Sequence, residues 1–348
     1  MRCHSCFKPI ENTLYCNKCK KELFGGKTIN RLSFDKREFY QYRQSNATRM
    51  SISGVQDKIS LKLEGNNLVP TDINGEYILK PVPAAHLEHS EDIVPNEHLS
   101  MQLSSQIFGI PTALNAIVLF NDGEMAYLAK RFDYAKDGTK LDQEDFAAVI
   151  GTSEQSDGEN YKYDSTYEAI AMQIKNRFPA SRIMLEDFFK RVLFNYLIGN
   201  GDAHLKNFSI YRPEGRDDYD LTPNYDVLFT KYHMNETVGE MALELFETIE
   251  TRSYGALGFY SMEDFQVFAD LLEIPPKRQE KIYSNLFGSI KKAEGMIQSS
   301  FMSEEGKQAY LDNFIARIAK RLCHRPVQKG YEFESVIIPF AEQYLKSD

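Results

Sequence analysis

The sequence of 348 residues predicts an α+β protein of two lobes, a β-rich N-lobe and a helical C-lobe, preceded by a small zinc ribbon. Three observations predict this order. Four cysteines lie within the first 19 residues, strand-like runs fill much of residues 51–133, and apolar residues recur at three- and four-residue spacing from about residue 182 onward. We place the ribbon at residues 1–25, the N-lobe with its connector at 26–180 and the C-lobe at 181–348. Ligands usually bind in the cleft between two such lobes.

The composition is that of an ordinary soluble globular protein, with 42% hydrophobic and 26% charged residues. The net charge of −9 argues against a chain whose main task is to coat nucleic acid, because such proteins present a basic face. No apolar run approaches the roughly 18 residues that span a bilayer, and the N-terminus lacks the apolar region of a secretory signal. We therefore expect a cytoplasmic protein that has no membrane partner.

The first element is a pair of C-x-x-C motifs, Cys3 with Cys6 and Cys16 with Cys19, separated by nine residues. In a reducing cytosol this clustering favours a metal site over disulfides. Two such motifs place four thiolates around one Zn²⁺ at about 2.3 Å. The segment is too short for a core of its own, so the metal would supply its folding energy. Redox chemistry is the competing interpretation, and paired motifs fit it less well.

The second element, at residues 31–49, is a polar and partly helical connector in which aromatic and basic side chains alternate. Such a stripe could stack on nucleic-acid bases. The more common alternative, which we favour, is an amphipathic helix that docks on its own domain.

The N-lobe follows in strand and helix signals. Residues 51–82 alternate as two strands around a turn at Asn66-Asn67. A helix is predicted from Pro95-Asn96 to a stop at Gly109. The turn Asn-Asp-Gly at 121–123 joins two further strand-like runs, which is a strong hairpin signal.

The strongest chemical pattern lies in GNGDAHLKNFSIYR and LTPNYDVL. Asp202 and Asn207 are five residues apart in a loop after an apolar helix, and Asp226 follows 19 residues later. Phosphoryl transfer from ATP needs a carboxylate that accepts the hydroxyl proton, together with an amide oxygen and a second carboxylate that hold Mg²⁺. This loop has the kinase spacing. His204 could support the loop, and Lys206 could lie near the transferred phosphate. The D-x-x-x-x-N pattern alone is weak, because N-G-D is also a common turn.

Two further elements fit the same chemistry in the order of a kinase chain. A serine-rich loop with Gly54 precedes the first strand pair, where backbone N–H groups could lie over phosphates. Lys80 ends the second strand, and Glu97 lies one helix later. In two-lobed kinases a strand lysine holds the phosphates and pairs with a helix glutamate. Lys80 taken alone is equally a solvated strand end, so the interpretation depends on all three elements.

The chain resembles the HipA family, the toxin serine/threonine kinases of bacterial toxin–antitoxin modules. In the family's order it contains SISGVQDK, ILKP, NEH, AKRFDY, QEDFA, KYDS, GNGDAHLKNFS and LTPNYDVL. The resemblance covers roughly residues 50–325, and its last two segments are specific. It implies a two-lobed protein-kinase-like fold and an ATP- and Mg²⁺-dependent serine/threonine kinase.

The resemblance also implies site roles. Asp202 matches the catalytic base, with Lys206 beside it, and Asn207 and Asp226 match the Mg²⁺ ligands. Residues that match ATP-binding positions are Lys80, Gly54, His204 and the adenine hinge of Lys130, Arg131 and Phe132. Ser51 and Ser53 match the loop that family members autophosphorylate, and the charge of about −1.5 to −2 on a phosphoserine would lower nucleotide affinity. Supporting positions are Glu97, Gln143, Asp145 and Tyr163.

The chain departs from full-length HipA, because only 50 residues precede Ser51 and the first 25 form the predicted ribbon. This resembles the short HipT-like form, in which a small HipS-like protein supplies the missing N-terminal subdomain. The implied partners are that protein, a HipB-like helix-turn-helix antitoxin that carries any DNA binding, and an aminoacyl-tRNA synthetase as substrate. The ribbon has no counterpart in the best-known members.

Two other functions are possible on the same residues. A catalytically silent pseudokinase or scaffold of the toxin–antitoxin complex would be favoured by loss of Asp202 or Asn207, and both are present. A small-molecule kinase of the aminoglycoside or lipid type shares D-x-x-x-x-N, but it fits S-x-S-G and L-T-P-x-Y-D poorly.

Overall fold

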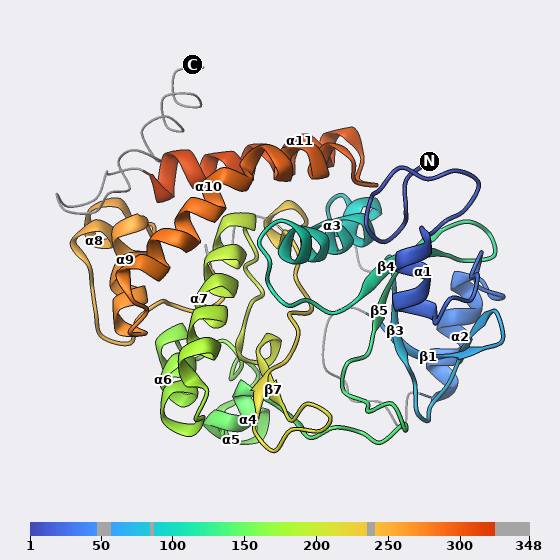
Figure 1. The fold of residues 1–348 in the computed structure, drawn as a ribbon, viewed down its shortest axis with the longest axis horizontal. Helices are drawn as coiled ribbons and strands as arrows, with labels where there is room; N and C mark the ends of the chain where they lie inside the picture. Colours follow the sequence, from blue (N-terminus) through green and yellow to red (C-terminus); the bar gives the residue numbers. More distant parts are fainter. Residues whose placement is uncertain (47–56, 84–86, 235–240, 324–348) are drawn as a thin grey trace.

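The computed structural model describes residues 1–46, 57–83, 87–234 and 241–323. Figure 1 shows a β-rich half that carries the N-terminus and a larger helical half, with α3 lying along the side where the two halves meet. The expected α+β arrangement of a sheet lobe and a helical lobe is confirmed.

The N-lobe is built on a five-stranded antiparallel sheet in the order β2-β1-β3-β5-β4. Its strands are β1 (Ile59–Glu64), β2 (Asn67–Pro70), β3 (Tyr77–Pro81), β4 (Asn115–Leu119) and β5 (Met125–Lys130). The hairpin at Asn-Asp-Gly joins β4 to β5, and Gly123 adopts the positive φ of 97° that this turn requires. β3 lies in the middle of the sheet, so both of its neighbours fix the position of its side chains.

Two N-terminal helices cover this sheet, α1 (Asn17–Phe24) and α2 (Lys36–Asn46). Phe34 and Phe39 are buried and meet Phe120, at ring-centroid distances of 5.9 and 6.4 Å. Their burial agrees with the docking interpretation of the aromatic connector and leaves these two rings no face for base stacking.

Helix α3 (Ile93–Gln106) packs between the sheet and the C-lobe, and twelve of its residues, from Ile93 through Ser104, are buried. A short 3₁₀ turn, η1 (Ser90–Asp92), leads into it. It begins two residues before the predicted Pro95-Asn96, because proline is accepted in the first turn as well as at the first position. A helix buried on all sides has little freedom to shift without repacking its neighbours.

The C-lobe combines a small antiparallel sheet, in the order β6-β7-β8, with a core of helices. Because β6 pairs with β7, this lobe includes residues from 143 onward, whereas the sequence predicted an N-lobe that extends to residue 180. Its strands are β6 (Gln143–Asp145), β7 (Ser209–Tyr211) and β8 (Asp220–Leu221). Its α-helices are α4 (Phe146–Ile150), α5 (Glu154–Asp157), α6 (Tyr167–Arg177), α7 (Ser181–Ile198), α8 (Arg252–Leu257), α9 (Met262–Leu271), α10 (Pro276–Gln298) and α11 (Glu304–Ala316). The short turns are η2 (Leu205–Asn207), η3 (Thr230–Tyr232) and the π-helical η4 (Arg317–Leu322).

Helix α7 is the centre of the C-lobe, and it ends where the candidate loop begins. Gly199 caps it with φ 75°, and its N–H reaches back to the carbonyls of Asn195 and Tyr196. None of the helices among the described residues is both long and apolar enough to cross a membrane.

The cap of α7 gives a first testable prediction. A Cβ at position 199 would lie 3.2 Å from the Phe229 ring and 3.3 Å from Asn313, in a left-handed conformation. We expect Gly199→Ala to lower the free energy of unfolding by about 1–2 kcal/mol, measured by urea denaturation. The matched control is Gly288→Ala in α10, where a Cβ meets nothing within 4 Å. The higher helix propensity of alanine should raise the free energy of unfolding of this variant by about 0.5–1 kcal/mol. Shifts of the two variants in the same direction would contradict this account.

Candidate active site

A buried lysine joins three separate parts of the chain. The Lys80 ammonium on β3 lies 2.7 Å from Glu97 Oε1 on α3 and 2.5 Å from Asp226 Oδ1 in the C-lobe. The side chains of Lys80 and Glu97 are 10% and 3% exposed, whereas that of Asp226 is 47% exposed. The structure thus brings together three residues that the sequence places 17 and 146 positions apart.

Burial and neighbouring charges shift the pKa values of these three residues in opposite directions. Burial raises the pKa of Glu97 to about 7, although the Lys80 charge works against the shift. Burial by itself would lower the pKa of Lys80, but the charges of Asp226 and Glu97 outweigh it and raise this pKa. Burial likewise opposes ionisation of Asp226, and the Lys80 charge holds the pKa of Asp226 below its ordinary value. Lys80 and Asp226 are therefore a charged pair at neutral pH, whereas the pKa of Glu97 lies close to neutral pH.

Asp226 is held in an uncommon backbone conformation, with φ 58°. Left-handed non-glycine residues are infrequent and gather at functional sites. The side-chain amide of Asn207 donates to the Asp226 carbonyl at 3.4 Å, and the hydroxyl of the preceding Tyr225 donates to the Lys206 carbonyl at 2.8 Å. These contacts tie Asp226 to the loop that carries Asp202 and Asn207.

The Asp202 loop is built by hydrogen bonds that begin at the end of α7. The Asn200 side chain accepts from the Asp202 N–H at 3.1 Å, and Thr230 Oγ1 accepts from the Gly201 N–H at 2.7 Å. The Asp202 side chain remains 49% exposed. The hydroxyl of Tyr163, itself 37% exposed, donates to Asp202 Oδ1 at 2.5 Å. A carboxylate that is fixed by its backbone and open to solvent can accept a proton from an incoming hydroxyl group.

His204 lies behind this carboxylate. Its ring is 6% exposed, its Nε2 is 3.8 Å from Asp202 Oδ1, and its centroid is 4.9 Å from that of Tyr163. Burial lowers the pKa of His204 below its ordinary value. Within the described part of the chain its Nδ1 has no hydrogen-bond partner. The contact with Asp202 fits the supporting role more directly than the ATP-binding role expected from the resemblance.

One functional candidate was missed by sequence reasoning. Lys58 is exposed directly before β1, and it interacts electrostatically with Asp226, Lys80, Glu97 and Lys206. Its position in QDK, directly after the serine-rich loop, is the sequence feature that could have identified it as a candidate. Lys58 and Lys80 thus both act on the carboxylate of Asp226, and two such cations can bind phosphate oxygens.

Other predicted residues lie elsewhere. The Lys130 ammonium donates to the Glu22 carbonyl at 2.9 Å and so points to the end of α1, away from the lysine cluster. Asp145 caps α4 by accepting from the Ala148 N–H at 2.9 Å, and Gln143 pairs with Tyr211 in the small sheet. The Phe132 ring lies 5.7 Å from that of Tyr225, beside the cluster. Ser51, Ser53 and Gly54 fall outside the described residues.

The donor set fits a magnesium–nucleotide complex. The carboxylate of Asp226 and the amide oxygen of Asn207 are the hard oxygen ligands that Mg²⁺ takes up beside phosphate and water. A carboxylate has two oxygens, so Asp226 can hold Lys80 with one and a metal ion with the other. Lys58 and Lys80 would supply positive charge for phosphate groups.

A second donor set lies at the N-terminus. The ligand atoms of Cys3, Cys6, Cys16 and Cys19 all lie within 4.8 Å of one another. Sγ of Cys6 and Sγ of Cys16 are 3.7 Å apart, and a tetrahedral site with bonds of about 2.3 Å separates its sulfurs by about 3.8 Å. The four thiols therefore fit one Zn²⁺ ion.

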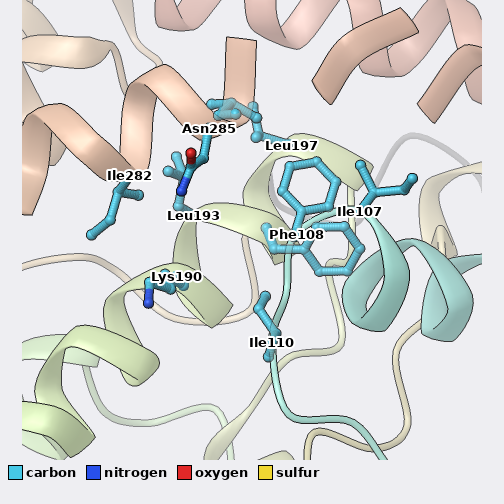
Figure 2. Close-up of a pocket in the computed structure, with 10 residues that line it drawn as sticks. Ile107, Phe108, Ile110, Lys190, Leu193, Leu197, Ile282 and Asn285 are labelled. Carbon is cyan, nitrogen blue, oxygen red and sulfur yellow. The ribbon is translucent and has the colours of Figure 1, made fainter. Parts of the chain in front are cut away.

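An apolar pocket lies away from these polar residues (Figure 2). It encloses about 410 Å³ including its opening. Figure 2 shows the side chains that line it coming from the chain just after α3, from α7 and from α10. It contains none of the predicted site residues, so it has no part in the chemistry described above.

Comparison with known proteins identifies the relatives of this chain. The family model of the HipA-like C-terminal domain matches residues 50–294. A Haemophilus influenzae protein named "Putative kinase" is 28% identical over 312 residues, which cover 84% of this chain and 86% of that protein. "Putative kinase Y4dM" of Sinorhizobium fredii is 30% identical over 201 residues, which cover 53% of this chain and 46% of that protein.

Two solved structures share the fold. A chain of the Shewanella oneidensis toxin–antitoxin complex of HipA, HipB and operator DNA has a TM-score of 0.56 at 20% identity, covering 90% of this chain and 71% of that chain. The Helicobacter pylori proinflammatory kinase CtkA has a TM-score of 0.51 at 14% identity, covering 82% of this chain and 94% of that chain. The expected two-lobed kinase-like fold is confirmed by both.

The raised pKa of Glu97 gives a second prediction. Between the ordinary value of 4.5 and about 7 the folded protein holds more protons at this group than the unfolded chain, so stability falls as the pH rises through that range. Relative to Glu97→Gln, we expect the wild type to lose about 2 kcal/mol of unfolding free energy between about pH 5 and 7.

The measurement is urea denaturation at several pH values. The exposed Glu214→Gln variant is the control, and its difference from the wild type should stay constant with pH. A constant difference for Glu97→Gln as well would contradict the raised pKa.

Proposed function

The chain belongs to the HipA-like C-terminal domain family, and from this premise we propose that it is an ATP- and Mg²⁺-dependent protein serine/threonine kinase, the toxin of a toxin–antitoxin module. The observation that carries the proposal is the contact of Lys80 with both Glu97 and Asp226. This contact brings together a cation and two carboxylates of the kind that phosphoryl transfer uses. They come from three elements that follow one another in the same order as in a kinase chain. The kinase names of the relatives support the same activity.

In the proposed reaction a serine or threonine hydroxyl attacks the γ-phosphorus of ATP. An oxygen–phosphorus bond forms to the hydroxyl oxygen, the bond from the γ-phosphorus to the bridging oxygen breaks, and ADP leaves. Asp202 accepts the hydroxyl proton. Tyr163 now donates to Asp202 Oδ1, so the substrate hydroxyl would take the place of the tyrosine hydroxyl.

The other residues bind the nucleotide. Lys80, fixed by Glu97, and Lys58 would hold phosphate oxygens, and Lys206 would lie near the transferred group. Asn207 and Asp226 would hold Mg²⁺, which supplies positive charge to the phosphates. The hinge of Lys130, Arg131 and Phe132 would receive adenine through its backbone and the Phe132 ring, since the Lys130 side chain turns away. Cys3, Cys6, Cys16 and Cys19 would bind structural Zn²⁺.

Regulation and partners follow from the family. Autophosphorylation on Ser51 or Ser53 would place negative charge beside the ATP phosphates and inactivate the enzyme. A HipB-like antitoxin is the proposed DNA-binding partner, supported by the Shewanella complex of HipA, HipB and operator DNA. A HipS-like subdomain protein and an aminoacyl-tRNA synthetase substrate complete the proposal.

The third prediction tests the activity. Unphosphorylated protein incubated with Mg-ATP should gain about 80 Da for one phosphate, mapped to Ser51 or Ser53 by peptide mass spectrometry. Asp202→Asn keeps the shape of the side chain but cannot accept the proton, so the rate should fall about 10²- to 10⁴-fold. The exposed Asp217→Asn variant is the control and should react as the wild type does.

Protein that already carries phosphate after expression would first be treated with a phosphatase. If the treated wild type gained no mass and bound no Mg-ATP in calorimetry, the kinase proposal would be wrong and the scaffold would take its place. Equal rates for wild type and Asp202→Asn would instead remove Asp202 as the base.

A further inference from the structure

The cysteine segment, residues 1–19, covers the free edge of the N-lobe sheet. β4 is an edge strand. The Ile117 N–H donates to the His4 carbonyl at 2.8 Å, Ser5 Oγ donates to the Asn115 carbonyl at 2.9 Å, and the Tyr15 hydroxyl donates to the Ile117 carbonyl at 2.9 Å. Exposed edge groups of a sheet need such partners, so the cysteine segment is part of the lobe and not an appendage to it.

The same segment contacts α3 at the residue next to Glu97. His98 is fully buried, and its Nε2–H donates to the Ser5 carbonyl at 2.9 Å. The Phe7 ring packs edge-on against His98 with centroids 4.8 Å apart. Successive helix residues point about 100° apart. Glu97 therefore faces Lys80 while His98 faces the cysteine segment.

One loop of the segment makes these contacts. Ser5 lies between Cys3 and Cys6, and Phe7 follows directly. The Cys6 carbonyl accepts from Gln106 Nε2 at 3.4 Å, near the end of α3. The loop thus contacts α3 at two places along the helix, and it is bounded by Cys3 and Cys6.

The metal would fix this loop. The Cys16 N–H donates to Cys3 Sγ at 3.2 Å, a bond that favours a thiolate at that position. A segment of this size cannot order itself by its own core, so metal binding supplies its folding energy. A contact that only the ordered loop can make then forms only when the metal is bound.

We propose that zinc binding by Cys3, Cys6, Cys16 and Cys19 positions α3 through Ser5 and His98, so that the Lys80–Glu97 contact depends on metal occupancy. His98 is a positioning residue in this scheme. The consequence for phosphoryl transfer rests on the proposed function, but the effect on α3 can be measured without any activity.

The first test removes the metal. Zinc is removed from the full chain with a chelator, and the number of zinc ions per chain is measured by elemental mass spectrometry. Hydrogen exchange of the backbone amides is then followed in α3 and in α7. We expect α3 to exchange about tenfold faster, α7 to be unchanged and added Zn²⁺ to restore the protection. The affinity for Mg-ADP should fall roughly tenfold.

The second test separates the contact from the metal. His98→Gln keeps an N–H donor for the Ser5 carbonyl, whereas His98→Leu removes it. Both should retain one zinc ion, and only His98→Leu should show faster exchange in α3. Cys323→Ser, at a buried cysteine outside the cluster, is the control for zinc content and should leave it at one ion.

Three results would overturn the proposal. Protein that binds no zinc when it is refolded with the ion lacks the site. Loss of zinc without a change in α3 would make the cysteine segment independent of the helix. Equal acceleration in α3 and α7 would mean that the metal supports the whole fold. None of these results bears on whether the enzyme transfers phosphate, so the two proposals fail separately.

Discussion

A lysine ammonium buried at the meeting point of three chain segments sets the main constraint on this structure. An unpaired charge in the interior is costly, and removing one partner of a buried pair leaves the other uncompensated. Lys80 meets this demand with Glu97 on one side and Asp226 on the other. The central strand, the helix between the lobes and the loop after β8 must therefore pack within a few ångströms of one another. The packing of the two lobes against each other and the assembly of the site thus depend on the same contacts.

The two carboxylates around Lys80 have different environments, and this suits them to different tasks. Glu97 is 3% exposed, and burial raises its pKa, so it serves as a fixed partner for the lysine inside the protein. Asp226 is 47% exposed, and the lysine charge keeps its pKa low, so it is an ionised carboxylate that solvent can reach. Its backbone is left-handed, a conformation that Asp tolerates better than most residues.

The sequence predicted the features that depend on local pattern. The hairpin at residues 121–123, the helix that carries Glu97 and the order of Lys80, Glu97 and Asp226 follow from turn chemistry, periodicity and spacing. It could not predict the contact of Tyr163 with Asp202 or of Ser5 with His98, because these pairs lie 39 and 93 positions apart and depend on how whole elements pack. The direction of the Lys130 side chain, toward the carbonyl of Glu22, has the same cause. The residue types thus indicate the chemistry, whereas the contacts that orient these side chains depend on the tertiary structure.

Helix α3 is the element on which the N-lobe, the C-lobe and the cysteine segment all act. At its start Asp92 accepts hydrogen bonds from the N–H and the hydroxyl of Ser303, at the beginning of α11. Along its side His98 donates to Ser5, and Phe301 from the same α10–α11 connection packs on His4 at 4.8 Å. The C-lobe and the cysteine segment therefore hold α3 from adjoining directions and touch each other at Phe301. A segment this short needs something other than a hydrophobic core to make it rigid, and four thiolates on one metal ion would do so with few residues.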